Sequence, residues 1–428
     1  MPGPLDSVRV LELAGPIGHY AGRLLADLGA DVVKVELPEG DEARYFEPRI
    51  PGVEEPESSF QFVLLNANKQ GVALDYRQPQ GREALLALVE RADVVVDSFS
   101  PAEAAALGLT HEQLCTVRPD LIHTSVTGWG LRGPYADWAY ADIVGCAMSG
   151  VMALAGFPEG PPEQLPDHQG YKCASINAAA GTVAALLHRL ASGEGQLVEV
   201  AMQEALSMAQ ETAMQSADIL GVDRARVGFA SGTLGISLPG VGLYAASDGW
   251  VYYMAMGTAG SGFRGLLEFM RDEGAAQDLD EEPYAGFISE TANRALIVQL
   301  LADPERAEET QRILDHVDEV VRAFSAGRSK QFLYEEGQRR RILVGMVSTP
   351  GDIAASPQLG DRGWFLEIED PRRGLRLHYP GFPWRLQGTP ASLRRPAPVL
   401  GEHTDVVLAD AGLSTRQIKA LRAAGVSR

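Results

Sequence analysis

The sequence predicts an α/β protein built on a doubly wound parallel sheet, Rossmann-like as in nucleotide-binding folds. Two observations support this prediction. In the first third of the chain, short apolar runs alternate with segments of helical spacing, and strands joined by crossover helices form parallel sheets. The chain is also long enough to bury a large core, since 45% of its 428 residues are hydrophobic.

The expected elements follow one another from the N-terminus. An apolar strand at 8–13 precedes a helix at 19–30, which ends in Gly-Ala, and a second strand at 31–36. After a polar loop we expect a strand at 71–76, a helix at 79–92, a strand at 93–99, a helix at 110–119 and a strand at 121–128. Residues 174–190 are almost all small or apolar, which predicts a buried helix.

The pattern changes near residue 226. A hairpin turning at 247–249 is expected there, followed by helices with acidic faces within 266–283 and 302–327. We therefore expect three segments: a large N-terminal part at 1–225, a smaller α+β domain at 226–330 and a C-terminal part at 331–428. A capped helix at 414–426 closes the chain.

Composition excludes several classes of function. A net charge of −20 opposes non-specific attraction to nucleic acids or anionic membranes. No run reaches the roughly 18 apolar residues of a membrane span, and the N-terminus does not resemble a signal peptide. The three cysteines lie far apart, which favours a reducing compartment without structural zinc. We expect a cytoplasmic protein that binds a small molecule.

The first strand-to-helix turn carries Gly15, Gly18 and Gly22, and the second strand ends at Glu36, where dinucleotide folds place an acid. The glycine spacing departs from GxGxxG, so we expect a tight turn with another binding role and no NAD. No GxSxG elbow of a serine hydrolase surrounds any candidate serine. His19 lies beside a glycine in a predicted loop and stays open as a site residue.

Six segments in one order resemble the class III CoA-transferases, the family of formyl-CoA:oxalate and carnitine CoA-transferases and bile-acid-inducible protein F. Alpha-methylacyl-CoA racemase is a more distant relative. The matching segments are 24–44, 66–101, 126–162, 184–206, 356–365 and 394–414. The resemblance implies a large Rossmann-like domain formed by both chain ends, a smaller domain between them, two interlocked subunits and a CoA thioester as ligand.

By position, the family's CoA contacts fall on six residues: Leu74, Arg77, Ser98, Phe99, Ala106 and Leu107. A guanidinium at Arg77 is suited to phosphate, because it can donate two parallel hydrogen bonds. Phe99 and Leu107 are suited to apolar or adenine contacts. The family often has Asn and Arg where this chain has Ser98 and Ala106. The resemblance also implies that residues 229–243 lie near the acyl end of the ligand.

In the mechanism that the resemblance implies, an Asp carboxylate attacks the acyl-CoA carbonyl and forms a mixed anhydride. The CoA thiolate then attacks this anhydride, which leaves an aspartyl-CoA thioester. Ungapped counts from both flanking segments place this Asp position on Tyr171. A phenol with a pKa of about 10 is not a substitute for a carboxylate. The racemase reaction is also disfavoured, because Ala141 stands where it needs a His.

Three hypotheses remain open. The first is a CoA-transferase that moves CoA between an acyl-CoA and a carboxylic acid, with Asp167, His168 and Tyr171 around the thioester in a rearranged loop. The second is a non-catalytic CoA-binding subunit that pairs with an Asp-containing homologue. The third is an acyl-CoA hydrolase or isomerase with His168 or His19 as base. We expect a homodimer, or a heteromer in the second case, and no metal.

Overall fold

The computed structural model describes residues 2–210, 213–226, 238–255, 260–290 and 294–428. These residues group into two compact units. The first unit contains Met1–Met152, Gln164–Met214 and Pro357–Arg428, and the second contains Ala153–Glu163 and Gln215–Ser356. The division into domains at 1–225, 226–330 and 331–428 stays a prediction. Most of the segment 229–243, expected near the acyl end, lies outside the described residues.

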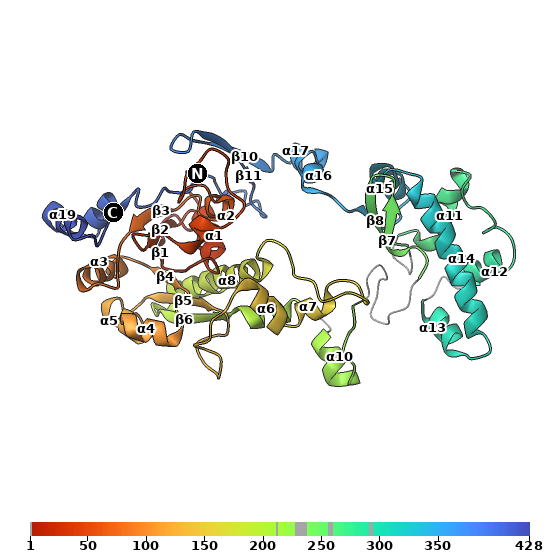
Figure 1. The fold of residues 1–428 in the computed structure, drawn as a ribbon, viewed down its shortest axis with the longest axis horizontal. Helices are drawn as coiled ribbons and strands as arrows, with labels where there is room; N and C mark the ends of the chain where they lie inside the picture. Colours follow the sequence, from red (N-terminus) through yellow and green to blue (C-terminus); the bar gives the residue numbers. More distant parts are fainter. Residues whose placement is uncertain (1, 211–212, 227–237, 256–259, 291–293) are drawn as a thin grey trace. The chain divides into compact units, whose positions relative to one another are not determined.

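A six-stranded parallel sheet forms the centre of the first unit (Figure 1), which confirms the predicted α/β sheet. Its strand order is β3-β2-β1-β4-β5-β6, and every neighbouring pair is parallel. The strands are β1 (Arg9–Glu12), β2 (Asp31–Glu36), β3 (Gln70–Ala73), β4 (Val94–Asp97), β5 (Ile122–Thr127) and β6 (Gln196–Ala201). The order reverses between β1 and β4, and ligands of such sheets bind at this switch point, beyond the carboxyl ends of the strands.

Helices cover both faces of the sheet. One apolar core joins it to α1 (His19–Asp27) and α8 (Gln169–Ser192). A second core joins the opposite face to α3 (Pro79–Glu90), α5 (His111–Val117), α18 (Thr404–Asp410) and α19 (Thr415–Ala423). The C-terminal helices α18 and α19 thus pack on the same sheet as the N-terminal strands.

Shorter elements complete the first unit. They are η1 (Glu42–Tyr45), α2 (Phe60–Leu65), α4 (Pro101–Leu107), α6 (Asp142–Met148), α9 (Met202–Met208), α17 (Pro357–Asp361) and the hairpin of β10 (Phe365–Asp370) and β11 (Leu375–Pro380). Capping boxes begin the two consecutive helices between β4 and β5. Ser100 and Glu103 cap α4, and Thr110 and Gln113 cap α5. The helices α7 (Val151–Leu154) and α10 (Ala213–Leu220) lie where the chain passes from one unit to the other.

The second unit combines a three-stranded antiparallel sheet with helices. Its strands are β7 (Val241–Ala246), β8 (Gly249–Met254) and β9 (Val344–Met346), and the turn between β7 and β8 confirms the predicted hairpin. Its helices are α11 (Gly262–Asp272), α12 (Tyr284–Glu290), α13 (Arg294–Ala302), α14 (Ala307–Ala326), α15 (Lys330–Arg339) and α16 (Pro350–Ala354). Of the described residues, no helix is both long and apolar enough to cross a bilayer.

Two predicted boundaries are wrong. The helix expected at 174–190 begins five residues earlier, at Gln169, so Tyr171 lies in a helix and not in a loop. The reason is a tertiary contact, because the Asp142 side chain accepts a hydrogen bond from the Tyr171 backbone N at 2.9 Å and satisfies one of the free N–H groups of the first turn. The helix expected through 266–283 ends at Asp272, where Gly274 with a φ of 65° follows.

Candidate functional site

At the switch point of the sheet, Ser98 connects the segments that follow β1 and β4. At the end of β4, Ser98 Oγ accepts a hydrogen bond from the Gly15 backbone N at 2.9 Å, which joins β4 to the turn between β1 and α1. The Tyr140 hydroxyl donates to the Ser98 carbonyl oxygen at 3.3 Å. Ser98 is therefore already bonded to the scaffold, and it connects the turn after β1 to the segment before α6.

Residues predicted to contact CoA meet where β3 and β4 lead into α3 and α4. The rings of Tyr76 and Phe99 pack edge to face, with centroids 6.2 Å apart, and so connect the two strand exits. On α4, Ala106 is exposed and Leu107 is half-buried. Leu74, in contrast, is fully buried, and its backbone N donates to the Glu36 carbonyl oxygen at 2.8 Å, so a ligand does not reach it in this structure.

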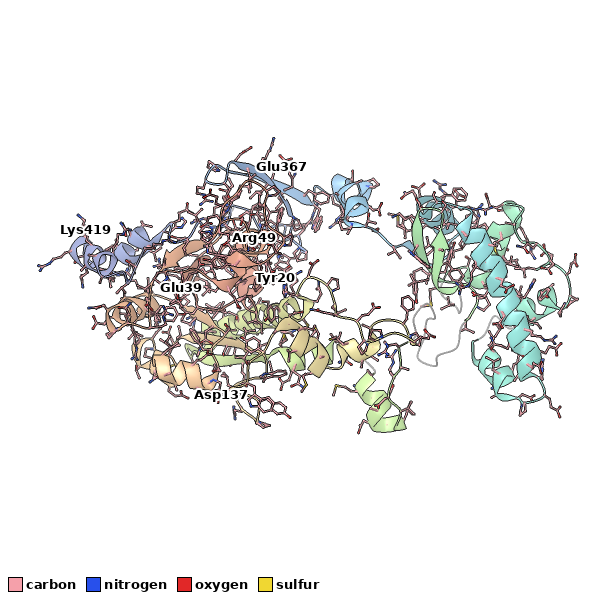
Figure 2. The ribbon with its side chains drawn as sticks, in the orientation of Figure 1. Tyr20, Glu39, Arg49, Asp137, Glu367 and Lys419 are labelled. Carbon is pink, nitrogen blue, oxygen red and sulfur yellow. The ribbon has the colours of Figure 1, made fainter. Side chains whose placement is uncertain are left out.

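Arg77 is the predicted phosphate ligand, and its guanidinium already has carboxylate partners. Its Nε donates to Asp75 at 2.7 Å and its Nη2 to Glu39 at 3.1 Å. Figure 2 labels Glu39 on the first unit. The side chain of Arg77 is 50% exposed, so the guanidinium stays open to solvent. A CoA phosphate would compete with these two carboxylates for it.

The predicted acyl end lies at the start of α8. Tyr171 is buried, and its ring stacks on His168 with centroids 5.7 Å apart. The other face of His168 stacks on Phe46, at 5.5 Å. The three rings form one aromatic stack in which Nδ1 of His168 is buried and has no hydrogen-bond partner within the described part of the chain.

The phenol of Tyr171 is a weak acid in this place. Burial raises its pKa to about 12, with the negative charges of Glu42 and Asp142 adding to the effect. Burial and the neighbouring Tyr171 also raise the pKa of Tyr140. At neutral pH both phenols therefore stay protonated, and each is a hydrogen-bond donor and not a nucleophile.

Asp167 differs from its two neighbours in the predicted site, because its side chain faces solvent. Its side chain is exposed and makes no hydrogen bond or ion pair with the residues that the structure describes. Asp167 and His168 both have left-handed backbone conformations, with φ of 57° and 52°. Two such residues in succession are unusual without glycine, and strained backbone of this kind concentrates at functional sites. The structure thus brings His168 and Tyr171 together and leaves Asp167 in solvent.

A buried ionic network lies behind the turn after β1, and the sequence analysis did not identify it. Lys34 Nζ lies 2.8 Å from His19 Nε2 and 3.1 Å from Asp41 Oδ2. Lys69 Nζ donates to Glu12 Oε1 at 2.9 Å. All of these side chains are buried or nearly so, and the signal for them was a charged residue inside an otherwise apolar parallel strand.

Each charge in this network depends on the others. Burial would raise the pKa of Asp41, but His19 and Lys34 hold it well below its usual range. Burial lowers the pKa of Lys69 to about 8, although Glu12 opposes this effect. Burial likewise lowers the pKa of His19. Because His19 has no exposed surface, a ligand does not reach it in this structure, which argues against His19 as a base.

The network also positions the aromatic stack. Asp41 Oδ1 accepts a hydrogen bond from the Ala43 backbone N at 2.8 Å and caps η1, and Phe46 follows η1 directly. Glu36, at the position of a ribose-binding acid, instead accepts two hydrogen bonds from Arg44, at 2.6 and 2.8 Å. Both residues are buried, so Glu36 supports η1 and is not available to a nucleotide.

Comparison with known proteins places this geometry in a family. The model of CoA-transferase family III matches residues 5–404. Among curated proteins, the succinyl-CoA:(R)-benzylsuccinate CoA-transferase subunit BbsE of Thauera aromatica is 32% identical, and the match covers 96% of this chain and 95% of that protein. The succinyl-CoA:mesaconate CoA-transferase of Haloarcula hispanica is also 32% identical, with 96% and 98% covered.

Solved structures have the same fold. A CAIB/BAIF family protein from Brucella suis superposes with a TM-score of 0.78 at 27% identity, covering 96% of this chain and all of that one. A hypothetical protein from Mycobacterium tuberculosis reaches a TM-score of 0.71 at 23% identity, with 95% and 99% covered. The similarity therefore extends over nearly the whole chain in sequence and in structure.

Proposed function

Because the chain belongs to CoA-transferase family III, we propose that it binds an acyl-CoA thioester and acts in the transfer of CoA to a carboxylic acid, as the subunit that does not supply the nucleophile. A homologous subunit that carries the Asp would perform the covalent steps. The two chains would interlock, as the resemblance to the family implies.

The observation that carries this proposal is the environment of Tyr171. The family's mechanism needs a carboxylate whose acyl derivatives exchange with a thiolate. At the matching position this chain has a buried phenol with a pKa near 12, stacked on His168. A phenol that keeps its proton does not attack a thioester at neutral pH, and an aryl ester is not the mixed anhydride that the CoA thiolate must open.

Neighbouring carboxylates do not supply a simple replacement. The Asp142 side chain accepts hydrogen bonds from the Tyr171 backbone N and from the Cys146 thiol, so it caps α8. Asp167 is exposed at the strained turn before the helix. Its carboxylate therefore lies outside α8, before the N-cap residue His168, whereas Tyr171 lies in the first turn of the helix.

Two relatives support a heteromeric enzyme that uses succinyl-CoA. The Thauera aromatica protein BbsE is named as a subunit of a succinyl-CoA:(R)-benzylsuccinate CoA-transferase, and this name describes a heteromeric enzyme. The second, a succinate–glutarate CoA-transferase from Agrobacterium fabrum, is 31% identical over 95% of both chains. We therefore propose succinyl-CoA as the CoA donor and a second carboxylic acid as the acceptor.

The test compares the chain alone with the chain mixed with an Asp-bearing homologue encoded beside it. Succinyl-CoA and a panel of carboxylic acids are supplied, and acyl exchange is followed by mass spectrometry. The proposal predicts binding of CoA by the chain alone, with exchange only in the mixture. Exchange by the chain alone that is lost in Asp167→Ala, and kept in the control Asp137→Ala, would show that it is a complete transferase.

One observation favours a second candidate, acyl-CoA hydrolysis. The buried and unpartnered Nδ1 of His168 resembles a base without a substrate, although its stacked ring has little freedom to turn. Release of free CoA without any acceptor acid, abolished by His168→Gln and retained in Asp167→Asn, would establish this activity. Failure of the wild-type chain to release CoA excludes it.

A further inference from the structure

We propose that Arg82, on the first turns of α3, binds a phosphate group of CoA. This inference rests on the proposed function, since it requires that the chain binds CoA. No motif in the sequence indicates Arg82, because it lies within an ordinary amphipathic helix. Its position becomes apparent only from its contact with α4.

Arg82 reaches from α3 to the end of α4. Its Nη2 donates a hydrogen bond to the Gly108 carbonyl oxygen at 3.1 Å. Gly108 caps α4 with a φ of 68°, and a Cβ added there would overlap the Arg82 guanidinium. The guanidinium therefore lies directly against Gly108, the residue after Leu107. Ala106 and Leu107 are the two positions on α4 where CoA contacts are expected.

A second contact joins the same two segments. Tyr76 precedes α3, Phe99 precedes α4, and their rings pack at 6.2 Å. Arg82 is thus part of a junction that already contains the apolar surface suited to adenine. A phosphate group bound beside this apolar surface would need a cation, and the Arg82 guanidinium supplies one.

The Arg82 guanidinium has unused hydrogen-bonding capacity. Its Nε is buried without an acceptor, and no carboxylate pairs with Arg82 among the described residues. Buried donors without a partner are rare and costly. Arg77, which precedes α3, differs in this respect, because Asp75 and Glu39 already pair with its guanidinium.

Phosphate fits this unused capacity better than other partners. A guanidinium presents a planar set of N–H donors that matches the oxygens of a phosphate. The chain carries a net charge of −20, so a polyanion such as CoA needs a local cation to approach it. Ala106 stands where the class III pattern often has Arg, and Arg82 would supply from α3 the charge that α4 lacks.

The experiment measures binding of CoA and of 3′-dephospho-CoA to the full chain by titration calorimetry. We expect Arg82→Gln to weaken CoA binding about 10- to 100-fold, and Arg82→Lys, which keeps the charge but not the fork, to weaken it less. If dephospho-CoA is unaffected by Arg82→Gln, the ligand is the ribose 3′-phosphate. If both ligands weaken equally, it is the diphosphate.

The matched control is Arg91→Gln, which removes the same charge from the other end of α3 and should change affinity less than about twofold. A melting temperature within the range of the wild type shows that each variant is folded. CoA binding by Arg82→Gln that equals the wild type would overturn the inference while the proposed function stands. Failure of the wild-type chain to bind CoA would overturn the proposed function itself.

Discussion

The two ends of the candidate site differ in the chemical groups that they present. At the junction of α3 and α4, the exposed and half-buried groups include those that we propose to bind CoA: two arginines and the ring of Phe99. At the start of α8, the place expected for a nucleophile holds the buried phenol of Tyr171. Recognition and covalent chemistry are thus separable in this fold, since residues from different strands supply them.

The proposed function requires that a member of the family keep its fold without a carboxylate at the position of Tyr171. The contact of Asp142 with the Tyr171 backbone holds the first turn of α8 whichever side chain stands at 171. Replacing a carboxylate with a phenol at this position therefore does not disturb the helix.

The largest effect is expected from Tyr171→Asp, which restores a carboxylate at the acyl end. If only the nucleophile is missing, this variant should gain exchange activity on its own, at least about 100-fold above the wild-type chain. The measurement is acyl exchange between succinyl-CoA and an acceptor acid. Tyr171→Asn, of the same size without the charge, is the control and should stay inactive.

The second effect concerns the ionic network that supports both ends. Asp41→Asn should destabilise the protein by about 3 kcal/mol at pH 7, because it removes one of the two carboxylates that pair with the buried Lys34. The pKa of Asp41 is lowered in the folded state, so its stabilisation is complete above the unfolded pKa near 4 and declines as the pH falls below it.

Urea unfolding at pH 7 and at pH 3 measures the free energy of unfolding of the wild type and of Asp41→Asn. The difference between the two free energies should be smaller at pH 3 than at pH 7. The control is Asp31→Asn, whose pair with Arg9 is partly exposed and should contribute at most about 1 kcal/mol. The same difference in free energy between wild type and Asp41→Asn at both pH values would show that the Asp41 charge does not stabilise the fold.

A smaller effect is expected at the CoA end from Arg77→Gln. Because Asp75 and Glu39 compete for this half-exposed guanidinium, its loss should weaken CoA binding only about two- to fivefold. Titration calorimetry measures the CoA affinity of Arg77→Gln, which is compared with the affinity of Arg82→Gln. A loss at Arg77 that exceeds the loss at Arg82 would mean that Arg77 is the principal cation.

The smallest effects are expected from Tyr171→Phe and Asp167→Asn in the complex with an Asp-bearing homologue. Neither variant removes a hydrogen bond between described side chains, so each should change the exchange rate less than about twofold. Initial rates at saturating succinyl-CoA test this. A drop of tenfold or more in Asp167→Asn would assign the chemistry to this chain.

Much of the fold could be predicted from the sequence, because its strands are short apolar runs separated by helices of regular spacing. The strand at 31–36 and the helix at 79–92 are examples. The early start of α8 could not be predicted, since its first turn contains Gly170 and depends on Asp142, 29 residues away.

The site was predictable only in part. Counting along the chain indicated Tyr171, and the structure adds its burial and its stack with His168 and Phe46. The ionic network and the contact of Arg82 with Gly108 join segments far apart in sequence. The charged Lys34 within an apolar strand indicates a buried charge, but a local pattern does not show which distant residues pair with it.

The most direct test of the central claim is to identify which chain becomes covalently modified. The complex with an Asp-bearing homologue is mixed briefly with succinyl-CoA and denatured, and the intact mass of each chain is measured. Our account predicts an acyl or CoA adduct on the homologue and none on this chain. An adduct on this chain that maps to Asp167 and disappears in Asp167→Asn would contradict the account.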